Sequence, residues 1–360
     1  EMAVPPPDPL FVLRGSGTPV NTLHFSCRDA VTPLLFSGSA KGTIHIWNLT
    51  THRAERTLDG HGGASVLWLS TLRSADALIS VVQCVDFRGS PLLVHRDSTR
   101  ESCHGQFTLL TRLLITAVDY QCPAAPCCWS FAGHTRSGVL YATQEQISPN
   151  ENEMMIKALY SMTPCRGLKV RIIELPSKMP VCSLKPEAKL GMPMCLKLWQ
   201  PDSGCSPQLL VGYEDGTIAL WDLSQRKQLS HLAAYSQPVM CLDFDQGKLR
   251  GVSGSSETVI KSWSLDGQQR LQLQDSVEVV NPGISQLCIR EDRKILASAG
   301  WDHRIRVFGW KKLKPLAVLQ YHMDSVHCVS FSDHREPSQR LMAAGSKDRR
   351  ISVWSIYTSN

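Results

Sequence analysis

Long apolar runs are missing from this sequence, which limits where the protein is expected to lie in the cell. The nearest candidate, 107–118, is interrupted by Arg112, whereas a membrane-spanning helix needs about 20 consecutive apolar residues. Residues 1–9 are rich in proline and lack the apolar core of a signal peptide, so we expect a flexible tail there. We therefore expect an intracellular protein without a membrane span, in the cytoplasm or also in the nucleus.

Paired cysteines and cofactor motifs are also missing. None of the 13 cysteines forms a C-x-x-C pair, and no histidine stands at a spacing suited to zinc. Prolines interrupt the tightest cluster, Cys122 with Cys127 and Cys128. We therefore expect free thiols in a reducing compartment rather than disulfides or a metal site. No G-x-x-x-x-G-K-S phosphate loop occurs either, and we predict no cofactor.

A strong charge of one sign is lacking as well. The formal charge is only +6, from 38 Lys and Arg against 32 Asp and Glu, and 42% of the residues are hydrophobic, which suits an ordinary globular core. Basic residues concentrate at 303–314 and 347–350. We interpret them as a solvated strand edge and a surface loop, with a patch for nucleic acid or an acidic partner as the alternative. Because the excess is small, nucleic acid is not the partner we expect.

What the sequence does contain is one pattern that is repeated five times. Its clearest copy, 212–223, reads G-Y-E-D-G-T-I-A-L-W-D-L. An acidic turn joins two apolar runs there and predicts a β-hairpin. Each copy has an isoleucine three residues before an aromatic residue. The pairs are Ile44/Trp47, Ile218/Trp221, Ile260/Trp263, Ile305/Phe308 and Ile351/Trp354, and Val170/Ile173 marks a degenerate sixth copy.

The spacing of the copies predicts the architecture. The aromatic residues at 221, 263, 308 and 354 follow one another at intervals of 42, 45 and 46 residues. Periods in the forties, each with several short strands, indicate an all-β propeller. At about 40–45 residues per blade, the chain has room for seven or eight blades in a single domain, 1–360. We expect seven, with 84–165 as a degenerate or inserted segment, because the pattern is lost there.

These repeats resemble WD40 repeats, and within that superfamily the chain most resembles the G-protein β-subunit-like protein 1 group. The resemblance rests on 190–199, 212–216, 294–308 and 343–355, and it also covers 11–63 but not roughly 80–165. It implies a WD40 propeller that acts as a non-enzymatic scaffold or adaptor for other proteins in a multiprotein assembly. Related fungal proteins are associated with a chaperone-linked assembly that matures phosphatidylinositol-3-kinase-related kinases.

The alternative that this resemblance leaves open is a G-protein β-like signalling subunit. True β-subunits begin with a long helix that forms a coiled coil with the γ-subunit. This sequence has only about ten residues before its first predicted strand, without a heptad pattern. We therefore do not expect a γ-subunit as a partner.

A short strand at 11–15 stands apart from the repeats. The sequence also ends soon after Trp354, which lies on the third strand of its blade. We therefore expect the N-terminal strand to complete the last blade and to close the ring, because closure removes exposed sheet edges.

In WD40 repeats a histidine in the loop that enters a blade bonds to the turn aspartate, and a strand serine and the tryptophan complete a structural network. Lys41 and Glu257 replace the turn aspartate, and Val211 and Ala344 replace the serine, so we expect no complete repeat. Because His, Ser and Asp recur in every blade of WD40 proteins, a structural role is favoured over a catalytic triad, and we predict no enzyme activity. The candidate network residues are His61, His322, Ser37, Ser253, Ser298, Asp215, Asp302, Asp348, Trp47, Trp221, Trp263 and Trp354.

Trp301 is the candidate for partner binding. It stands one residue before Asp302, where the other copies have Ala40, Glu214, Ser256 and Lys347, so no shared packing role demands an aromatic residue. Tryptophan is enriched among binding hot spots because it buries a large area at low entropic cost. The alternative is that Trp301 covers an adjacent loop.

Overall fold

The computed structural model describes residues 8–26, 34–59, 61–72, 77–82, 92–97, 107–113, 155–161, 169–175, 180–199, 201, 206–332, 334 and 339–356. These residues form 27 β-strands and no α-helix, which confirms the all-β class. The chain divides into two compact units. The first comprises 1–69, 254–260 and 275–360, and the second comprises 70–253 and 261–274.

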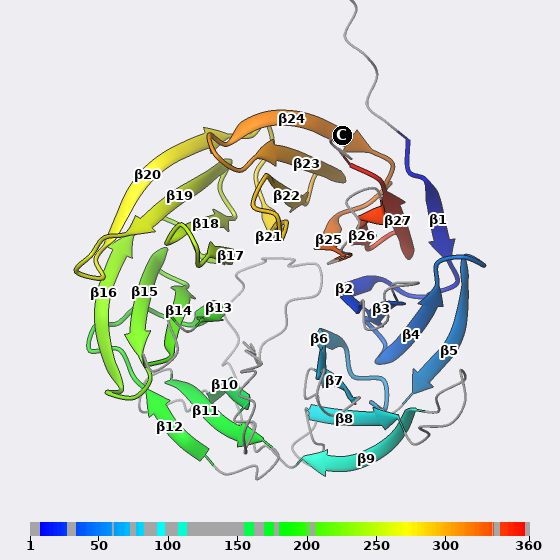
Figure 1. Ribbon diagram of the computed structural model, residues 1–360, viewed down its shortest axis with the longest axis horizontal. Coiled ribbons are helices and arrows are strands. Elements are labelled where there is room, and N and C mark those ends of the chain that lie inside the picture. Colours follow the sequence, from blue (N-terminus) through cyan, green and yellow to red (C-terminus); the bar gives the residue numbers. More distant parts are fainter. Residues whose placement is uncertain are drawn as a thin grey trace, which may run out of the picture. The chain divides into compact units, whose positions relative to one another are not determined.

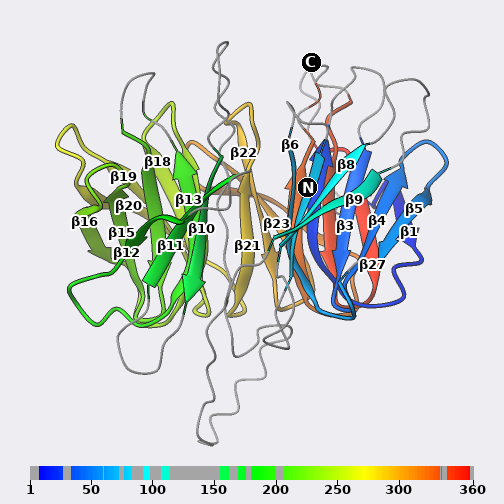
Figure 2. The same cartoon turned by 90° about the horizontal axis from the view of Figure 1, so that it is seen from below.

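The first unit contains three complete four-stranded antiparallel sheets, with the strand orders β2-β3-β4-β5, β21-β22-β23-β24 and β1-β27-β26-β25. Figure 1 shows each of them as a row of neighbouring strands, and β3, β4 and β5 stand side by side in Figure 2. Their strands are β1 (Phe11–Arg14), β2 (Val20–Ser26), β3 (Leu34–Ser39), β4 (Thr43–Asn48), β5 (Arg53–Asp59), β21 (Ile284–Ile289), β22 (Ile295–Gly300), β23 (Arg304–Gly309), β24 (Lys314–Gln320), β25 (Val326–Phe331), β26 (Met342–Ser346) and β27 (Arg350–Trp354).

The second unit contains the four-stranded sheet β13-β14-β15-β16 and the three-stranded sheet β10-β11-β12. The sheets β6-β7-β8-β9 and β17-β18-β19-β20 have residues in both units. The strands of these four sheets are β6 (Val66–Leu72), β7 (Ala77–Val82), β8 (Leu92–Asp97), β9 (Phe107–Leu113), β10 (Met155–Ser161), β11 (Lys169–Leu175), β12 (Pro180–Leu184), β13 (Pro193–Trp199), β14 (Gln208–Tyr213), β15 (Thr217–Asp222), β16 (Lys227–Ala233), β17 (Val239–Asp245), β18 (Arg250–Ser255), β19 (Val259–Leu265) and β20 (Leu271–Glu278).

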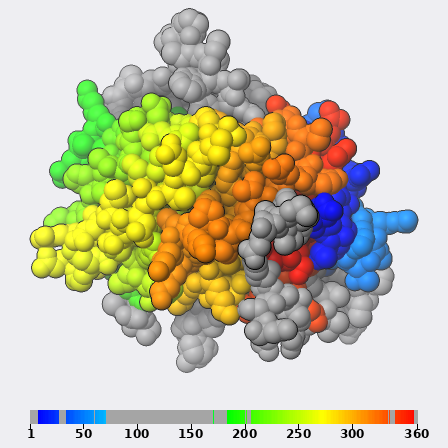
Figure 3. Space-filling model, turned by 90° about the horizontal axis from the view of Figure 1, so that it is seen from above, coloured from blue at the N-terminus to red at the C-terminus, as the bar shows by residue number. Residues whose placement is uncertain are grey.

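The N-terminal strand β1 pairs antiparallel with β27, with Leu13 opposite Ile351 and Phe11 opposite Val353. The prediction that the first strand completes the sheet of Trp354 is confirmed. Figure 3 shows the blue residues of this strand beside red residues of the C-terminal sheet. Leu13 is buried together with Ile351 and Val353 in one apolar cluster, so burial as well as hydrogen bonding holds β1 in place.

The isoleucine and the aromatic residue of each motif are both buried. All five isoleucines are fully buried, and the five aromatic residues are at most 2% exposed. Residues three apart on a strand point to opposite faces of the sheet. Both faces of these strands are therefore covered, which explains why the motif is apolar almost throughout.

A glycine recurs at the start of the motif because the next sheet packs directly against it. A Cβ added to Gly38 would lie 2.5 Å from Val66, and one added to Gly345 would lie 2.6 Å from Val20. In the second unit the same holds for Gly212, which faces Val239 at 2.7 Å. In each case the valine begins an edge strand of another sheet.

The segment 84–165 was predicted as degenerate or inserted, and it contains three described strands, β8, β9 and β10. Most of 84–165, including 84–87, lies outside the described residues. The third strand of the sheet that begins with β6 is β8. The predicted tail, 1–9, also lies outside them up to residue 7. The degenerate sixth motif forms β11, which lies between β10 and β12 in its sheet.

Candidate functional site

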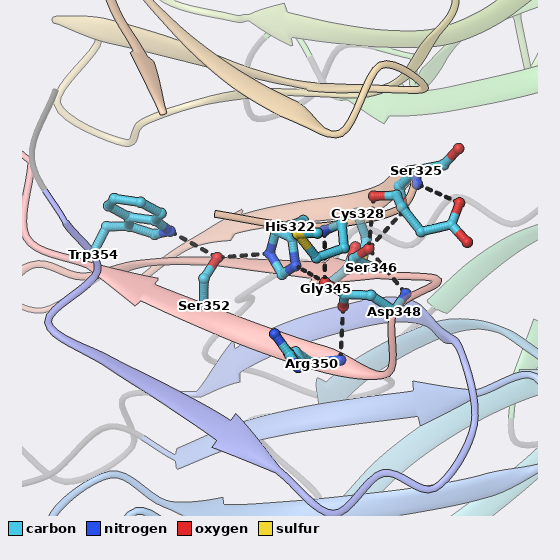
Figure 4. Close-up of polar contacts among 11 residues, drawn as sticks. His322, Ser325, Cys328, Gly345, Ser346, Asp348, Arg350, Ser352 and Trp354 are labelled. Carbon is cyan, nitrogen blue, oxygen red and sulfur yellow. Dashed lines mark hydrogen bonds and ion pairs between the residues drawn. The ribbon is translucent and has the colours of Figure 1, made fainter. Parts of the chain in front are cut away.

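The most complete polar network lies in the sheet β25–β27 (Figure 4). His322, in the loop before β25, places Nδ1 2.9 Å from Asp348 Oδ2 and Nε2 2.8 Å from Ser352 Oγ. Trp354 Nε1 donates to the same Ser352 Oγ at 2.8 Å. Four side chains from a loop, a turn and β27 are thus joined in series.

Two groups in this network have only one possible role. An ionised carboxylate only accepts, so His322 Nδ1 carries a proton and donates it to Asp348, and an indole N–H only donates, so Ser352 Oγ accepts from Trp354. In the neutral imidazole Nε2 is then an acceptor, and the Ser352 hydroxyl donates to it. Burial raises the pKa of Asp348, but the bonds from His322 and from the amides of Met323 and Arg350 outweigh burial and hold the pKa below its usual value.

A serine, a histidine and an aspartate in this order have the connectivity of a hydrolytic triad, but the surroundings do not suit a nucleophile. Ser352 is fully buried, and its oxygen is occupied by Trp354 on one side and His322 on the other. A nucleophilic serine needs open space for a carbonyl carbon and an oxyanion site. The arrangement stabilises the turn and the strand instead.

The expectation that no repeat is complete is wrong for this sheet. Ala344 occupies the usual serine position, and its cross-strand partner is Ser352, so the hydroxyl comes from the neighbouring strand. The signal in the sequence was a serine two residues before the aromatic residue, where the other clear copies have His45, Ala219, Lys261 and Arg306. Only the strand register shows that the two positions face each other.

Two other sheets use the predicted strand serine. Trp47 Nε1 donates to Ser37 Oγ at 2.8 Å in the first unit, and Trp263 Nε1 donates to Ser253 Oγ at 3.2 Å in the second. In the second unit Tyr235 stands where His322 stands in the last sheet. Its hydroxyl donates to the Ser253 carbonyl at 2.6 Å and lies 3.1 Å from Ser253 Oγ.

Asp302 has different partners from those the motif predicts. Arg306 donates to both of its carboxylate oxygens, at 3.0 and 2.5 Å, and Asn281 Nδ2 donates at 3.0 Å. Burial raises the pKa of Asp302, but these hydrogen bonds together with the arginine charge hold it below its usual value. The Ser298 hydroxyl of the same sheet is buried and makes no hydrogen bond to any described residue.

The remaining candidates stay apart. Asp215 accepts hydrogen bonds from the amide and the hydroxyl of Thr217 and so caps its own turn. Trp221 is buried, and its Nε1 makes no hydrogen bond within the described residues, since Val211 replaces the serine. His61 is buried before β6 and lies against the turn glycine Gly42. The twelve candidates therefore belong to separate sheets rather than to one site.

Trp301 lies half-buried in the turn between β22 and β23. Its indole packs directly on Gly283, because a Cβ there would lie 2.1 Å from Trp301 Cδ2. The Trp301 amide donates to the Gly283 carbonyl at 3.0 Å, and Ser325 Oγ donates to the Trp301 carbonyl at 3.0 Å. The residue thus covers an adjacent loop and also retains an exposed part.

The described ranges contain no group of three or more His, Cys, Asp or Glu side chains placed to hold a metal ion. None of the four cysteines with described side chains, Cys195, Cys241, Cys288 and Cys328, forms a disulfide. Burial raises the pKa of Cys328 to about 12. No helix in the described part of the chain has the length and hydropathy that a membrane crossing requires.

Comparisons with known proteins agree with this repeated architecture. A family model described as "WD domain, G-beta repeat" matches residues 7–48, 278–309 and 313–355. The chain is 45% identical to the guanine nucleotide-binding protein subunit beta-like protein 1 of Mus musculus, over 98% of this chain and 97% of the relative. The chain belongs to this family of WD40-repeat proteins. It is also similar to two fungal proteins named ASTRA-associated protein 1, at 27% identity in Schizosaccharomyces japonicus and 24% in Schizosaccharomyces pombe; both matches cover 98% of this chain and 99% of the relative.

WD40 proteins of this family are scaffolds in protein complexes and are not known as enzymes. This agrees with the expectation that the protein is not an enzyme. The arrangement around Ser352 that resembles a triad is a buried hydrogen-bond network within one sheet.

Proposed function

We propose that the protein is a non-enzymatic scaffold or adaptor in the assembly of a multiprotein complex. The observation that carries this proposal is the similarity over nearly the whole chain to the mouse relative and to the ASTRA-associated proteins. The printed name of the fungal relatives points to membership of an assembly. For this chain we propose the chaperone-linked maturation of phosphatidylinositol-3-kinase-related kinases, in the cytoplasm and nucleus.

The second candidate is a G-protein β-like signalling subunit, which the printed name of the mouse relative favours. The two candidates predict different partners. Purification of the tagged chain from cells, followed by mass spectrometry, should recover subunits of a kinase-maturation assembly and no γ-subunit. Recovery of a γ-subunit in stoichiometric amount would favour the signalling function instead.

We further propose that the chain forms one ring of seven blades. The described residues contain seven sheets, which supports one sheet per blade. In this arrangement β1 closes the ring by completing the sheet of β25–β27. The candidate network residues then serve to hold turns and strands of individual blades, and partner binding falls to exposed loops.

Trp301 is the residue that we propose as an anchor for a partner. Its indole rests on Gly283, so it is held in one orientation before a partner arrives, which lowers the entropic cost of binding. Trp301→Ala should remove specific co-purifying proteins. Because the indole is half-buried, a small loss of stability is also expected.

The matched control is Leu316→Ala, which shortens an exposed apolar side chain of β24 in the same sheet. It should leave both the set of co-purifying proteins and the melting temperature unchanged. If Trp301→Ala keeps every partner, or unfolds the protein, Trp301 is a structural residue and the anchor role is refuted.

A further inference from the structure

Four segments of the first unit lie next to one another at one end of two sheets, and we call them the loop edge: 279–283, 301–303, 321–325 and 347–349. Hydrogen bonds join them in a row. The Trp301 amide reaches the Gly283 carbonyl, Ser325 Oγ reaches the Trp301 carbonyl, and the Lys347 amide reaches the Ser325 carbonyl at 3.0 Å. The Met323 amide also donates to Asp348 Oδ2 at 3.1 Å.

The loop edge presents apolar side chains to solvent. Val280 is 82% exposed and Met323 is 77% exposed, more than any other large hydrophobic residue in the described ranges. Half-buried Trp301 lies between the loops that carry them, since it bonds to Gly283 on one side and to Ser325 on the other. Monomeric proteins rarely group exposed apolar residues without an interaction purpose.

Two of the three acids of the loop edge are directed inward. Asp302 is held by Arg306, which is only 6% exposed, and by Asn281. Asp348 is held by His322, whose side chain is fully buried. Asp324 forms an exposed ion pair with Lys347 at 3.6 Å, so these two charges largely cancel.

Two basic side chains of the loop edge are directed outward. His303 and Arg349 are both exposed, and neither side chain has a hydrogen bond or ion pair with a described residue. At the margin, exposed Glu278 and half-buried Arg304 carry opposite charges. The outward-facing surface is therefore apolar with a basic rim.

These two basic residues occupy the third position of their turns, where the backbone is left-handed. The equivalent turns of two other sheets have glycine there, Gly42 with φ 84° and Gly216 with φ 89°, whereas His303 has φ 68° and Arg349 has φ 69°. A side chain at such a position is disfavoured relative to glycine. Both turns of the loop edge nevertheless carry a basic residue, and neither side chain makes a hydrogen bond or an ion pair with a described residue.

We propose that the loop edge binds a short acidic segment of a partner protein. An apolar side chain of that segment packs on Trp301 between Val280 and Met323, and its carboxylates pair with His303 and Arg349. The proposal rests on the scaffold function given above and specifies the chemistry of one partner. Charge complementarity decides between classes of segment. Arg349 has no acidic partner among the described residues, whereas the loop-edge acids Asp302, Asp348 and Asp324 are held by Arg306, His322 and Lys347.

The test uses the purified full chain and three short fluorescein-labelled peptides that alternate leucine with glutamate, glutamine or lysine. Fluorescence anisotropy should show binding of the glutamate peptide, weaker binding of the glutamine peptide and none of the lysine peptide. The affinity for the glutamate peptide should decrease when the salt concentration is raised from about 50 mM to about 300 mM, since salt screens exposed charges.

The variant H303G/R349G removes both basic side chains and suits the left-handed backbone, so it should fold normally. It should weaken binding of the glutamate peptide about threefold to tenfold, as expected for exposed polar pairs, and leave binding of the glutamine peptide unchanged. Lys312→Gly is the matched control, because it removes an exposed cation from the turn at the other end of β23, and it should change neither affinity.

Equal affinity of wild type and H303G/R349G for the glutamate peptide would overturn the proposal. The proposal would also be overturned if a fluorescein-labelled single-stranded oligonucleotide bound as tightly as the glutamate peptide and lost the same affinity in H303G/R349G. The loop edge would then recognise phosphates. If wild type binds no glutamate peptide while Trp301→Ala still loses its partners in cells, this inference fails and the scaffold function stands. Peptide binding with no partner recovered from cells would refute the scaffold function instead.

Discussion

Ser352→Ala tests the polar network of the last sheet most directly. The hydroxyl accepts from Trp354 and donates to His322, and both of these side chains are almost completely buried. Removing it leaves two buried polar atoms, Trp354 Nε1 and His322 Nε2, without partners. Each costs about 1–3 kcal/mol, so we expect a loss of about 2–5 kcal/mol in the free energy of unfolding.

The structure offers a matched control in the neighbouring sheet. Ser298 stands at the usual serine position of β22, and its buried hydroxyl has no partner among the described residues. Ser298→Ala removes the same atoms without breaking a hydrogen bond. It should therefore be neutral or slightly stabilising, because an unsatisfied buried hydroxyl disappears.

A second substitution tests the register. Ala344 faces Ser352 across the sheet, and the equivalent Ser37 accepts from Trp47 in its own sheet. Ala344→Ser in the Ser352→Ala background should therefore return an acceptor to Trp354 and recover about half of the lost stability. Ala344→Ser alone should bring no gain, because it adds a buried hydroxyl to a network that is already satisfied.

Urea unfolding and thermal melting measure these differences, with a shift of the melting temperature of about 2 °C per kcal/mol for a domain of this size. The reasoning is refuted if Ser352→Ala costs no more than Ser298→Ala. It is also refuted if Ala344→Ser makes the Ser352→Ala protein less stable, since the hydroxyl would then not reach the indole.

Three further predictions concern other parts of the fold. Removing residues 1–14 should lower the melting temperature markedly, because β27 loses its partner strand and the core loses the buried side chain of Leu13. An unchanged melting curve would show that β1 contributes nothing to stability. Trp221→Ala should cost about 3–5 kcal/mol in urea unfolding, whereas Trp221→Phe should cost much less because Nε1 has no described hydrogen-bond partner; equal costs would argue against this. The pKa of Asp302 is lower in the folded chain than its usual value, so the unfolded chain binds the proton first as the pH falls. The stabilisation that ionised Asp302 contributes is present above about pH 4 and is lost as the pH falls through the pKa of Asp302 in the folded chain. Asp302→Asn should therefore reduce the loss of stability in acid. A pH dependence of stability identical to that of wild type would contradict this.

The sequence predicted the repeated elements well because their signals are local. The hairpin predicted around Asp215 forms between β14 and β15. The pairing of β1 with β27 was also predicted, since a short strand at one end matched a missing strand at the other. These inferences need only hydrophobic alternation, turn residues and a period.

The polar partners were not predictable in the same way, because they depend on cross-strand register and on loops of different length. Ser352 replaces the hydroxyl missing at Ala344 only because the two residues face each other. Tyr235 and Asn281 act in loops where the pattern led us to look for histidine. The contact of Trp301 with Gly283 likewise joins residues of separate segments, and the periodic pattern of the sequence does not predict it.

The inward partners of the turn acids also shape the surface of the loop edge. Arg306 holds Asp302 and His322 holds Asp348, so two carboxylates that begin in turns are directed toward partners within the sheets. If either acid were released, it would lie within the same three-residue turn as His303 or Arg349 and would compete with a partner's carboxylates for that basic side chain. The structural networks thus have a second consequence, since the residues that stabilise the two sheets also leave the basic side chains of their turns available.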